Sequence, residues 1–254
     1  NRGYTVMHFS TIAREDPKLD RWPYEVTLKS PRELLDLTEA AAKMFRTHPA
    51  TENTRLVLLG HSMGGQRACA LAASDPDIDC LVLLAPAQMT RTGPDDTGDN
   101  LNMGAAHERL KSLDKNNDGV VRGKEVPESA DLDEDGTLRI WEVCASLARE
   151  ARTGMSPSRN PDRSGIPFGE HALAARSVPA LVLYGSLDEA QAHHAPILQD
   201  LQSTGVLPWV EVRVLHDLGH QLGPEQDGRF GPISSVALEQ IVEWLGKRNN
   251  PPQK

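Results

Sequence analysis

The sequence feature that most constrains the fold is a glycine–serine motif between an apolar run and an amphipathic segment. Gly60-His61-Ser62-Met63-Gly64 matches the pattern Gly-X-Ser-X-Gly. It directly follows the apolar run 56–59, which is typical of a strand buried on both faces, and it opens a segment, 63–74, with helical spacing. A strand that turns this sharply into a helix needs small residues around the turn, and it leaves the serine hydroxyl exposed at the sheet edge. The motif therefore predicts a strand–turn–helix unit that presents Ser62.

The rest of the chain repeats this alternation of apolar runs and amphipathic segments. We predict strands at 4–9, 56–60, 81–85, 180–184 and 210–215, and helices at 31–48, 63–74, 189–203 and 233–245. Such an alternation indicates an α/β fold with a mostly parallel sheet flanked by helices.

One long segment interrupts this pattern. No comparable apolar run lies between residues 85 and 178, and this part is rich in Asp, Asn, Gly, Pro and Ser. We therefore predict a core in two parts, 1–86 and 177–247, separated by an insertion, 87–176, and followed by a polar tail, 248–254.

The insertion contains two adjacent twelve-residue segments, 114–125 and 131–142, that match the calcium-binding loop of an EF-hand. In such a loop, oxygen ligands at positions 1, 3 and 5, a carbonyl at position 7 and a glutamate at position 12 surround the ion, and glycine at position 6 permits the sharp bend. The candidate Ca²⁺ ligands are Asp114, Asn116, Asp118, Val120 and Glu125 in the first loop, and Asp131, Asp133, Asp135, Thr137 and Glu142 in the second. Position 8 is apolar in both loops (Val121 and Leu138), which favours a short pairing between them.

These loops depart from the standard pattern in two ways. Arg122 and Arg139 occupy position 9 and cannot ligate an ion, and no full helix fits between Glu125 and Asp131 because Pro127 lies there. The pair resembles the compact EF-hands of bacterial extracellular proteins. We expect a structural role, in which Ca²⁺ folds the insertion; a regulatory role as a lid is the alternative.

The motif around Ser62, with Gly65 after it, resembles the nucleophile elbow of the α/β-hydrolase superfamily in its lipase, esterase and serine-aminopeptidase form. The resemblance covers residues 1–88 and 177–247 and implies a catalytic triad of Ser62, Asp188 and His220, because these acid and base candidates follow the strands at 180–184 and 210–215. It also implies that the Met63 backbone N–H stabilises the oxyanion. The insertion falls where the family carries its cap.

Neighbouring residues leave alternatives open for the acid and the base. Glu189 is a rival acid, and His216 and Asp217 lie close to His220 in the sequence. His193 and His194 are adjacent, and we interpret them as a solvated helix face rather than as a metal site.

The resemblance implies cleavage of a carboxylic ester of a small molecule through a serine acyl-enzyme, with a peptide bond or a thioester as the nearest alternatives. A dehalogenase is disfavoured because that chemistry calls for a carboxylate at position 62. The hypothesis from another class is a calcium-binding protein on a catalytically weak or inactive hydrolase fold. It is motivated by the pair of EF-hand-like loops and by the position of Gly3-Tyr4-Thr5-Val6 at the start of this sequence. In the family, strands and a loop that supplies an oxyanion donor precede this pattern. We expect the chain to be incomplete at its N-terminus; otherwise residues 5–12 would serve both purposes.

Composition excludes several classes of protein. The formal net charge is -9 and no Lys/Arg cluster occurs, which disfavours nucleic acids and anionic membranes as partners. No apolar run is long enough for a transmembrane helix. Three cysteines, Cys69, Cys80 and Cys144, are too few for a disulfide framework, although a Cys69–Cys80 bridge stays open. The calcium loops suggest an extracytoplasmic location, periplasmic or secreted, where calcium levels suit weak EF-hand sites.

Overall fold

The computed structural model describes residues 31–52, 54–90, 103–127, 129–132, 134–152, 166–189, 191–226, 229–230 and 232–249. The strand expected at 4–9 lies outside these residues, as do Asp133 and two stretches of the insertion, 91–102 and 153–165. The description below refers to the described residues only.

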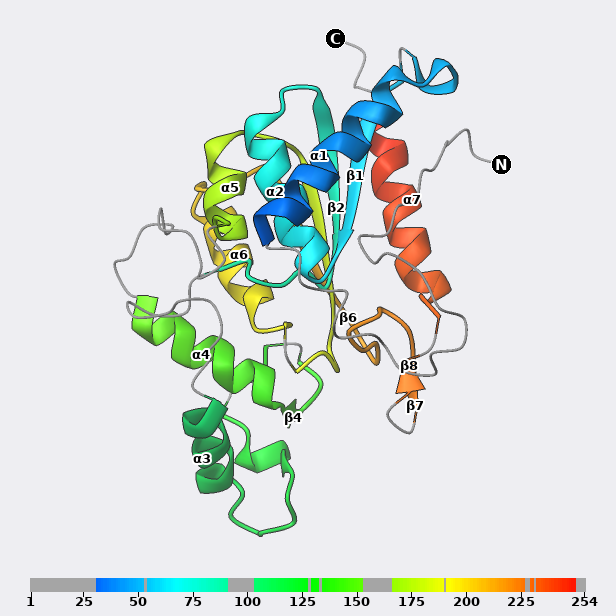
Figure 1. Ribbon diagram of the computed structural model, residues 1–254. Coiled ribbons are helices and arrows are strands. Elements are labelled where there is room, and N and C mark those ends of the chain that lie inside the picture. The colour runs from blue at the N-terminus through cyan, green and yellow to red at the C-terminus, as the bar shows by residue number, and fades with distance from the viewer. Residues whose placement is uncertain are drawn as a thin grey trace, which may run out of the picture.

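A four-stranded parallel sheet forms the centre of the molecule (Figure 1). Its strands are β1 (Leu56–His61), β2 (Ile78–Leu84), β5 (Ala180–Gly185) and β6 (Val210–Leu215), hydrogen-bonded in that order. Their Val/Leu runs are buried as expected of strands covered on both faces: all six residues of β5 are buried. Four predicted strands are thereby confirmed, and β2 begins three residues earlier than predicted.

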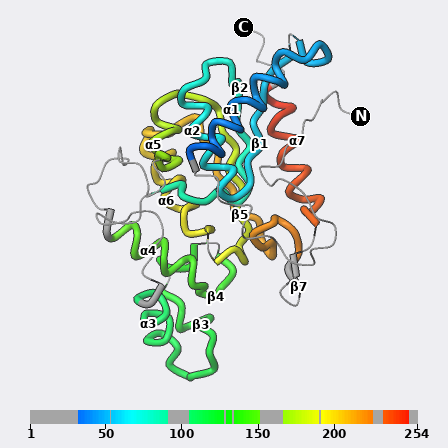
Figure 2. The backbone as a smooth tube through the Cα atoms, in the orientation of Figure 1, coloured from blue at the N-terminus to red at the C-terminus, as the bar shows by residue number. Residues whose placement is uncertain are grey.

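Helices cover the two faces of this sheet through two separate apolar cores. One core joins the sheet to α1 (Pro31–Thr47), α2 (Met63–Ser74), α5 (Gly169–Ala175) and α6 (His194–Ser203). The other joins the opposite face to α7 (Ser235–Asn249), through Ala237, Ile241 and Trp244. The path of the chain in Figure 2 shows α7 on the other side of the sheet from α1, α2, α5 and α6. Two short pairs of extended residues, Glu225–Gln226 (β7) and Arg229–Phe230 (β8), precede α7.

The insertion forms a small unit that projects from this core (Figure 1). It comprises α3 (Met103–Leu113), the two-residue strands β3 (Val121–Arg122) and β4 (Thr137–Leu138), and α4 (Ile140–Arg152). Its own apolar cluster includes Ala106, Val121, Leu138, Ile140, Val143 and Cys144. α4 also faces the main core, because Trp141 is fully buried there. The insertion is therefore packed against the main core rather than tethered to it by loops alone.

The helix predicted at 189–203 begins five residues later than expected, as α6 at His194. A helix from Glu189 would place Pro196 in its interior, where proline lacks the N–H donor and clashes with the preceding turn; from His194 it lies in the first turn. The prediction for α7 was also displaced, because this helix starts at Ser235 and continues to Asn249. The first two residues of the expected polar tail are thus helical, and the Arg248 guanidinium lies 4.5 Å from the Trp244 ring centroid.

The last part of the expected insertion packs with the core. The backbone N–H groups of Gly169 and Glu170 donate to the carbonyls of Gln88 and Met89, at 3.0 and 2.7 Å. These bonds join the segment before the projecting unit to the segment after it. The packing of α5 against α2 then attaches both segments to the core.

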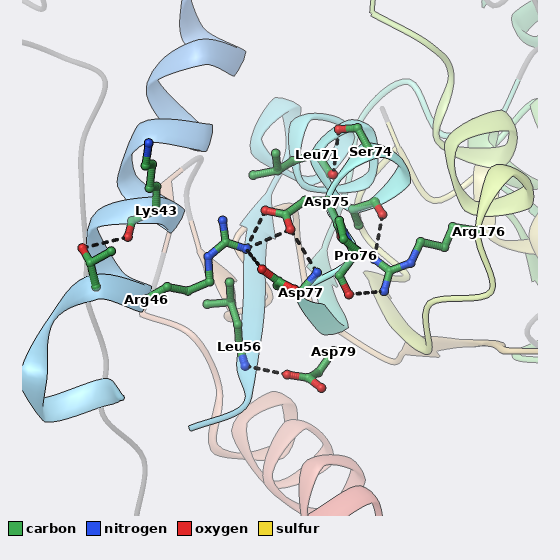
Figure 3. Close-up of polar contacts among 12 residues, drawn as sticks. Lys43, Arg46, Leu56, Leu71, Ser74, Asp75, Pro76, Asp77, Asp79 and Arg176 are labelled. Carbon is green, nitrogen blue, oxygen red and sulfur yellow. Dashed lines mark hydrogen bonds and ion pairs between the residues drawn. The ribbon is translucent and has the colours of Figure 1, made fainter. Parts of the chain in front are cut away.

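Charged side chains tie the end of the sheet remote from Ser62 (Figure 3). Arg46 of α1 pairs with Asp75, at 2.7 Å, beyond the end of α2. Burial opposes ionisation of Asp75, but the hydrogen bonds from Arg46 and the Asp77 backbone, together with the positive charges of Arg46 and Arg176, keep the pKa of this carboxyl below its ordinary value. From the other side, Arg176 donates to the carbonyls of Ala72, Asp75 and Pro76. These contacts fix α2, the helix that starts at the serine motif.

The three cysteines are buried and unbridged, so the Cys69–Cys80 pairing does not occur. Burial raises the pKa of the Cys80 and Cys144 thiols to about 11. Among the helices that the structure describes, none has the length and apolarity needed to cross a bilayer.

Candidate active site

Ser62 lies at the turn between β1 and α2 in a backbone conformation that side chains rarely adopt. Its φ is 52° and its ψ is -126°. The strain is held by three backbone hydrogen bonds: Ser62 N donates to the Leu84 carbonyl at 3.0 Å, and the Ser62 carbonyl accepts from Gly65 and Ala87 at 2.9 and 3.1 Å. The predicted strained turn is confirmed, and such strain is typical of functional positions.

The small residues around Ser62 have different reasons to be small. A Cβ at Gly60 would lie 2.5 Å from the Gly64 carbonyl oxygen, and one at Gly65 would lie 2.5 Å from Pro86 Cβ. A Cβ at Gly64 would meet no described atom within 4 Å. The crowding expected from the motif therefore applies to Gly60 and Gly65, and the space beside Gly64 is open.

Asp188 and His220 form a hydrogen-bonded pair although 32 residues separate them. His220 Nδ1 lies 2.8 Å from Asp188 Oδ2. The Asp188 side chain is 2% exposed and that of His220 is 25% exposed, so the acid is buried and the imidazole reaches solvent. Asp188 Oδ1 also accepts from the Gln191 N–H at 3.2 Å. With the carboxylate as acceptor, Nδ1 carries the proton and Nε2 of neutral His220 is a base.

The loop that carries His220 is fastened to the end of β5. A Cβ at Gly185 would lie 2.0 Å from the Leu218 carbonyl oxygen, so only glycine permits this approach. The Leu218 carbonyl accepts from Leu187 N–H at 2.9 Å, and the buried Ser186 Oγ accepts from Asp217 N–H at 3.0 Å. Gly185 and Ser186 were not predicted as site residues, although their place between a strand and the candidate acid is a usable signal.

The structure separates the candidate acid and base from their sequence neighbours. Glu189, the rival acid, is exposed, and so are His216 and Asp217, whereas Asp188 is buried against His220. The interpretation of His193 and His194 as a solvated helix face was wrong. Both are buried, their ring centroids lie 3.9 Å apart, and His194 Nδ1 lies 2.8 Å from Thr90 Oγ1. They are buried because the start of α6 packs under the segment that leaves β2.

His61 is a residue of the site that the sequence analysis named only as part of the motif. Its Nε2 lies 3.0 Å from the His220 carbonyl oxygen, and the two imidazole centroids are 4.8 Å apart. Burial is the main cause that lowers the pKa of His61, and the hydrogen bond to the His220 backbone opposes it only in part. The contact joins the strand before Ser62 to the loop that carries His220.

Met63 is the first residue of α2. The first N–H groups of a helix have no partner within it and lie at the positive end of the helix dipole. The Met63 N–H is therefore suited to an anionic oxygen next to Ser62, which is the role expected from the sequence.

The two candidate calcium loops share a detailed backbone geometry. Gly119 and Gly136, at position 6, have φ of 84° and 78° and donate to the first carboxylates, Asp114 and Asp131, at 2.9 Å each. The predicted pairing at position 8 is confirmed, because Val121 lies opposite Leu138 in an antiparallel pair. The 3-10 turn Gly123–Glu125 ends the first loop, and the described residues between the loops, 126–127 and 129–130, form no helix, as Pro127 predicted.

The side chains of these loops fit an ion in some respects and oppose it in others. Glu125 Oε2, at position 12, is buried without a hydrogen-bond partner. Glu142, the other position 12, is fully buried and accepts from the Leu132 and Arg139 N–H groups. Arg122 and Arg139 pair with Asp118 and Asp135, at 2.9 and 2.6 Å, so guanidinium groups hold the position 5 carboxylates. Within the described residues, which omit Asp133, no three His, Cys, Asp or Glu side chains are grouped closely enough to hold a metal.

The sequence matches the family described as serine aminopeptidase, S33, over residues 32–227. That range contains the strand and turn of Ser62, the insertion, and both members of the Asp188–His220 pair. A search among curated proteins found no match to this sequence.

Several solved structures resemble this fold. A carboxylesterase structure from Nitrososphaera gargenis is 14% identical, with a TM-score of 0.44, and the match covers 86% of this chain and 72% of that one. An esterase from Pyrococcus furiosus is 16% identical, with a TM-score of 0.42 and coverages of 85% and 60%. MenH from S. aureus is 18% identical, with a TM-score of 0.44 and coverages of 88% and 79%. The chain thus spans about 60% of the length of the Pyrococcus esterase.

Proposed function

This chain belongs to the serine aminopeptidase S33 family of α/β-hydrolases, and from that premise we propose that it is a serine hydrolase that cleaves a carboxylic ester. The observation that carries the proposal is the hydrogen-bonded Asp188–His220 pair, joined through His61 to the strained turn of Ser62. Acyl transfer of this kind uses a nucleophile, a base and an acid that orients the base, and Ser62, His220 and Asp188 supply groups suited to these three roles.

In the proposed reaction, Ser62 Oγ attacks the ester carbonyl carbon while His220 Nε2 takes the hydroxyl proton. The carbonyl oxygen becomes an oxyanion, which accepts a hydrogen bond from the Met63 N–H. Collapse of this intermediate breaks the bond to the alcohol, and His220 returns its proton to the leaving oxygen. Water then attacks the acyl-enzyme, with His220 again as base, and releases the acid and free Ser62. Asp188 keeps the proton on Nδ1 and stabilises the imidazolium that forms twice in each cycle.

An ester is the substrate that this site supports best. An amide carbonyl is less electrophilic, and its amine must be protonated as it leaves, so peptide cleavage demands more of His220 and of the oxyanion donors. A thioester and a peptide bond remain the alternatives within the same mechanism. The bound molecule in each case is a small acyl compound.

The proposal predicts that Ser62 becomes covalently labelled by a fluorophosphonate and that Ser62→Ala lowers kcat on p-nitrophenyl butyrate by a factor on the order of 10⁶, as for other serine nucleophiles. The adduct is mapped by mass spectrometry. Ser203→Ala is the matched control, because Ser203 is exposed at the end of α6 and should leave both readouts unchanged. A folded Ser62→Ala variant with wild-type turnover would show that this serine is not the nucleophile.

The alternative is a catalytically weak calcium-binding protein on a hydrolase fold. Its supporting observation is the pairing of the two loops through Val121 and Leu138. Absence of labelling at Ser62 in the folded wild-type protein, together with calcium binding, would favour this alternative over the enzyme.

We propose in addition that the insertion binds calcium through its two loops and is stabilised by it. The buried, unpartnered Glu125 Oε2 supports this, because the position 12 carboxylate closes the coordination shell with both oxygens. Calcium would have to displace or share the carboxylates that Arg122 and Arg139 hold, which favours weak sites. Dissociation constants of about 10⁻⁴–10⁻³ M are typical of extracellular modules, so we also propose an extracytoplasmic location.

Calcium binding is measured directly by titration calorimetry and by the change in melting temperature on adding a chelator. We expect the chelator to lower the melting temperature, since a ligand that binds only the folded state stabilises it by mass action. Glu125→Gln should reduce this effect, while Glu108→Gln, on the exposed face of α3, should preserve it. Equal melting temperatures with calcium and with chelator would refute the calcium proposal without affecting the hydrolase proposal.

A further inference from the structure

We infer that His61 is a positioning residue that sets the base, His220, relative to the nucleophile, Ser62. This inference rests on the proposed hydrolase function. His61, the residue before the serine, connects the turn of Ser62 to the loop that carries His220. The distance between these two segments decides whether a proton can pass from Ser62 to His220.

In the hydrogen bond between His61 and His220, the donor and the acceptor can be assigned. A backbone carbonyl oxygen only accepts hydrogen bonds, so His61 Nε2 must carry a proton and donate to the His220 carbonyl, at 3.0 Å. The two rings also touch, with centroids 4.8 Å apart and planes inclined by 55°. His61 therefore contacts both the backbone and the imidazole ring of His220.

The other contacts of the His220 loop attach it to a different strand. Leu218 and Asp217 are bonded to Leu187 and Ser186 at the end of β5, next to the acid. They place His220 relative to Asp188, whereas the contact of His61 places it relative to β1 and Ser62. The contact of His61 therefore links β1 to a loop that is held at the end of β5, although β2 lies between these two strands in the sheet.

The consequence for catalysis follows from the short range of proton transfer. A base acts at about 2.6–3.2 Å from the proton donor, and a displacement of about 1 Å can cost roughly 10²-fold in rate. Burial holds the pKa of His61 below its ordinary value, so this ring stays neutral and adds no second cation beside the imidazolium of His220. His61 thus contributes a hydrogen bond and a surface rather than a proton.

Two substitutions separate the hydrogen bond from the ring contact. His61→Gln keeps an N–H donor at similar reach and loses the ring, and His61→Phe keeps a ring and loses the donor. We expect His61→Phe to lower kcat on p-nitrophenyl butyrate by about 10–100-fold with KM within about 2-fold of wild type, and His61→Gln to restore kcat to within about 3-fold. His216→Phe is the control in the same loop, since His216 is exposed and should leave kcat unchanged.

A second readout does not need turnover. In ¹⁵N-histidine NMR of the folded wild type, we expect His61 as the Nε2-protonated tautomer and a low-field His220 Nδ1 proton, which His61→Gln retains and His61→Phe loses. If His61→Phe fails to fold, His61→Asn replaces it, because its shorter amide does not reach the carbonyl.

The inference is overturned if His61→Phe keeps the wild-type kcat and the His220 signal. It is also overturned if the His61→Gln and His61→Phe variants lose the same share of kcat and this loss follows the fall in their melting temperatures. Failure of the proposed function looks different. In that case wild-type Ser62 is not labelled by the fluorophosphonate, whereas the NMR comparison still shows whether His61 orders His220.

Discussion

At the scale of single residues, a few atoms decide whether the candidate site assembles. Gly185 has no Cβ, and this absence lets the His220 loop approach to a distance at which any side chain would collide with Leu218. Ser62 occupies a strained conformation that Gly60 and Gly65 make room for. The side chains of Ser62, His220 and Asp188 are common ones. The backbone around them brings them into an arrangement suited to catalysis.

His61 also makes stability depend on pH, and the direction follows from its lowered pKa. In the unfolded chain an imidazole has a pKa of about 6.5, so below this pH the unfolded state takes up the proton before the folded state does. The stabilisation by neutral His61 is therefore complete above about pH 6.5 and is lost as the pH falls through the folded pKa. We predict that wild type loses more unfolding free energy than His61→Gln between pH 7.5 and pH 5.5, measured by urea denaturation. Parallel pH profiles for the two proteins would contradict this.

At the scale of elements, α2 must be fixed at both ends because its first residue carries the expected oxyanion donor. Its start is fixed by the turn at Ser62. At its end, the Arg176 guanidinium donates to the carbonyl of Ala72 in the last turn and to the carbonyls of Asp75 and Pro76 just after the helix (Figure 3). Arg176, which lies between α5 and β5, thus anchors α2 from beyond its C-terminus.

We predict that Arg176→Ala lowers the unfolding free energy by about 1–3 kcal/mol, because it removes the hydrogen bonds from the guanidinium to three carbonyl groups. Arg32→Ala is the control: Arg32 pairs with Asp36 on the solvent side of α1, with side chains 75% and 57% exposed, and its loss should cost less than about 0.5 kcal/mol. Urea denaturation measures both. Equal effects of the two substitutions would show that the carbonyl contacts do not hold α2.

At the scale of the whole molecule, α4 connects the insertion to the core. Its Trp141 lies in the main apolar core, and the next residue, Glu142, closes the second candidate calcium loop. Further along the same helix, Arg149 makes two hydrogen bonds to Asp200 of α6, at 2.6 and 2.8 Å. α6 follows the turn of Asp188, so the insertion and the acid belong to one packed unit.

This packing predicts that Trp141→Ala destabilises the core as well as the insertion, by about 3–5 kcal/mol for the loss of a buried aromatic side chain. Calorimetry should show a single unfolding transition in the wild type, and the proposed calcium binding should be weaker in the variant because Glu142 loses its support. Arg109→Ala removes an exposed pair with Glu150 within the same insertion and should shift stability by less than about 0.5 kcal/mol. Two independent transitions in the wild type would contradict the coupling.

The sequence by itself determined those features that depend on neighbouring residues. Four parallel strands, the strained turn at Ser62 and the pairing of Val121 with Leu138 follow from local spacing, because apolar periodicity and glycine positions act within one or two turns of chain. The family, too, is recognisable from motifs of this kind. The start of α6 was misplaced because the prediction ignored the local restriction that Pro196 imposes.

Only the tertiary structure decided the features that depend on residues far apart in the chain. It left the rival acid Glu189 exposed, it buried His193 and His194, and it brought His61 to His220 across 159 residues. Sequence spacing carries no information about such contacts, since burial and hydrogen-bond partners arise only when strands and helices pack. For this protein, local chemistry set the nature of the groups, and packing across the sheet set which of them meet.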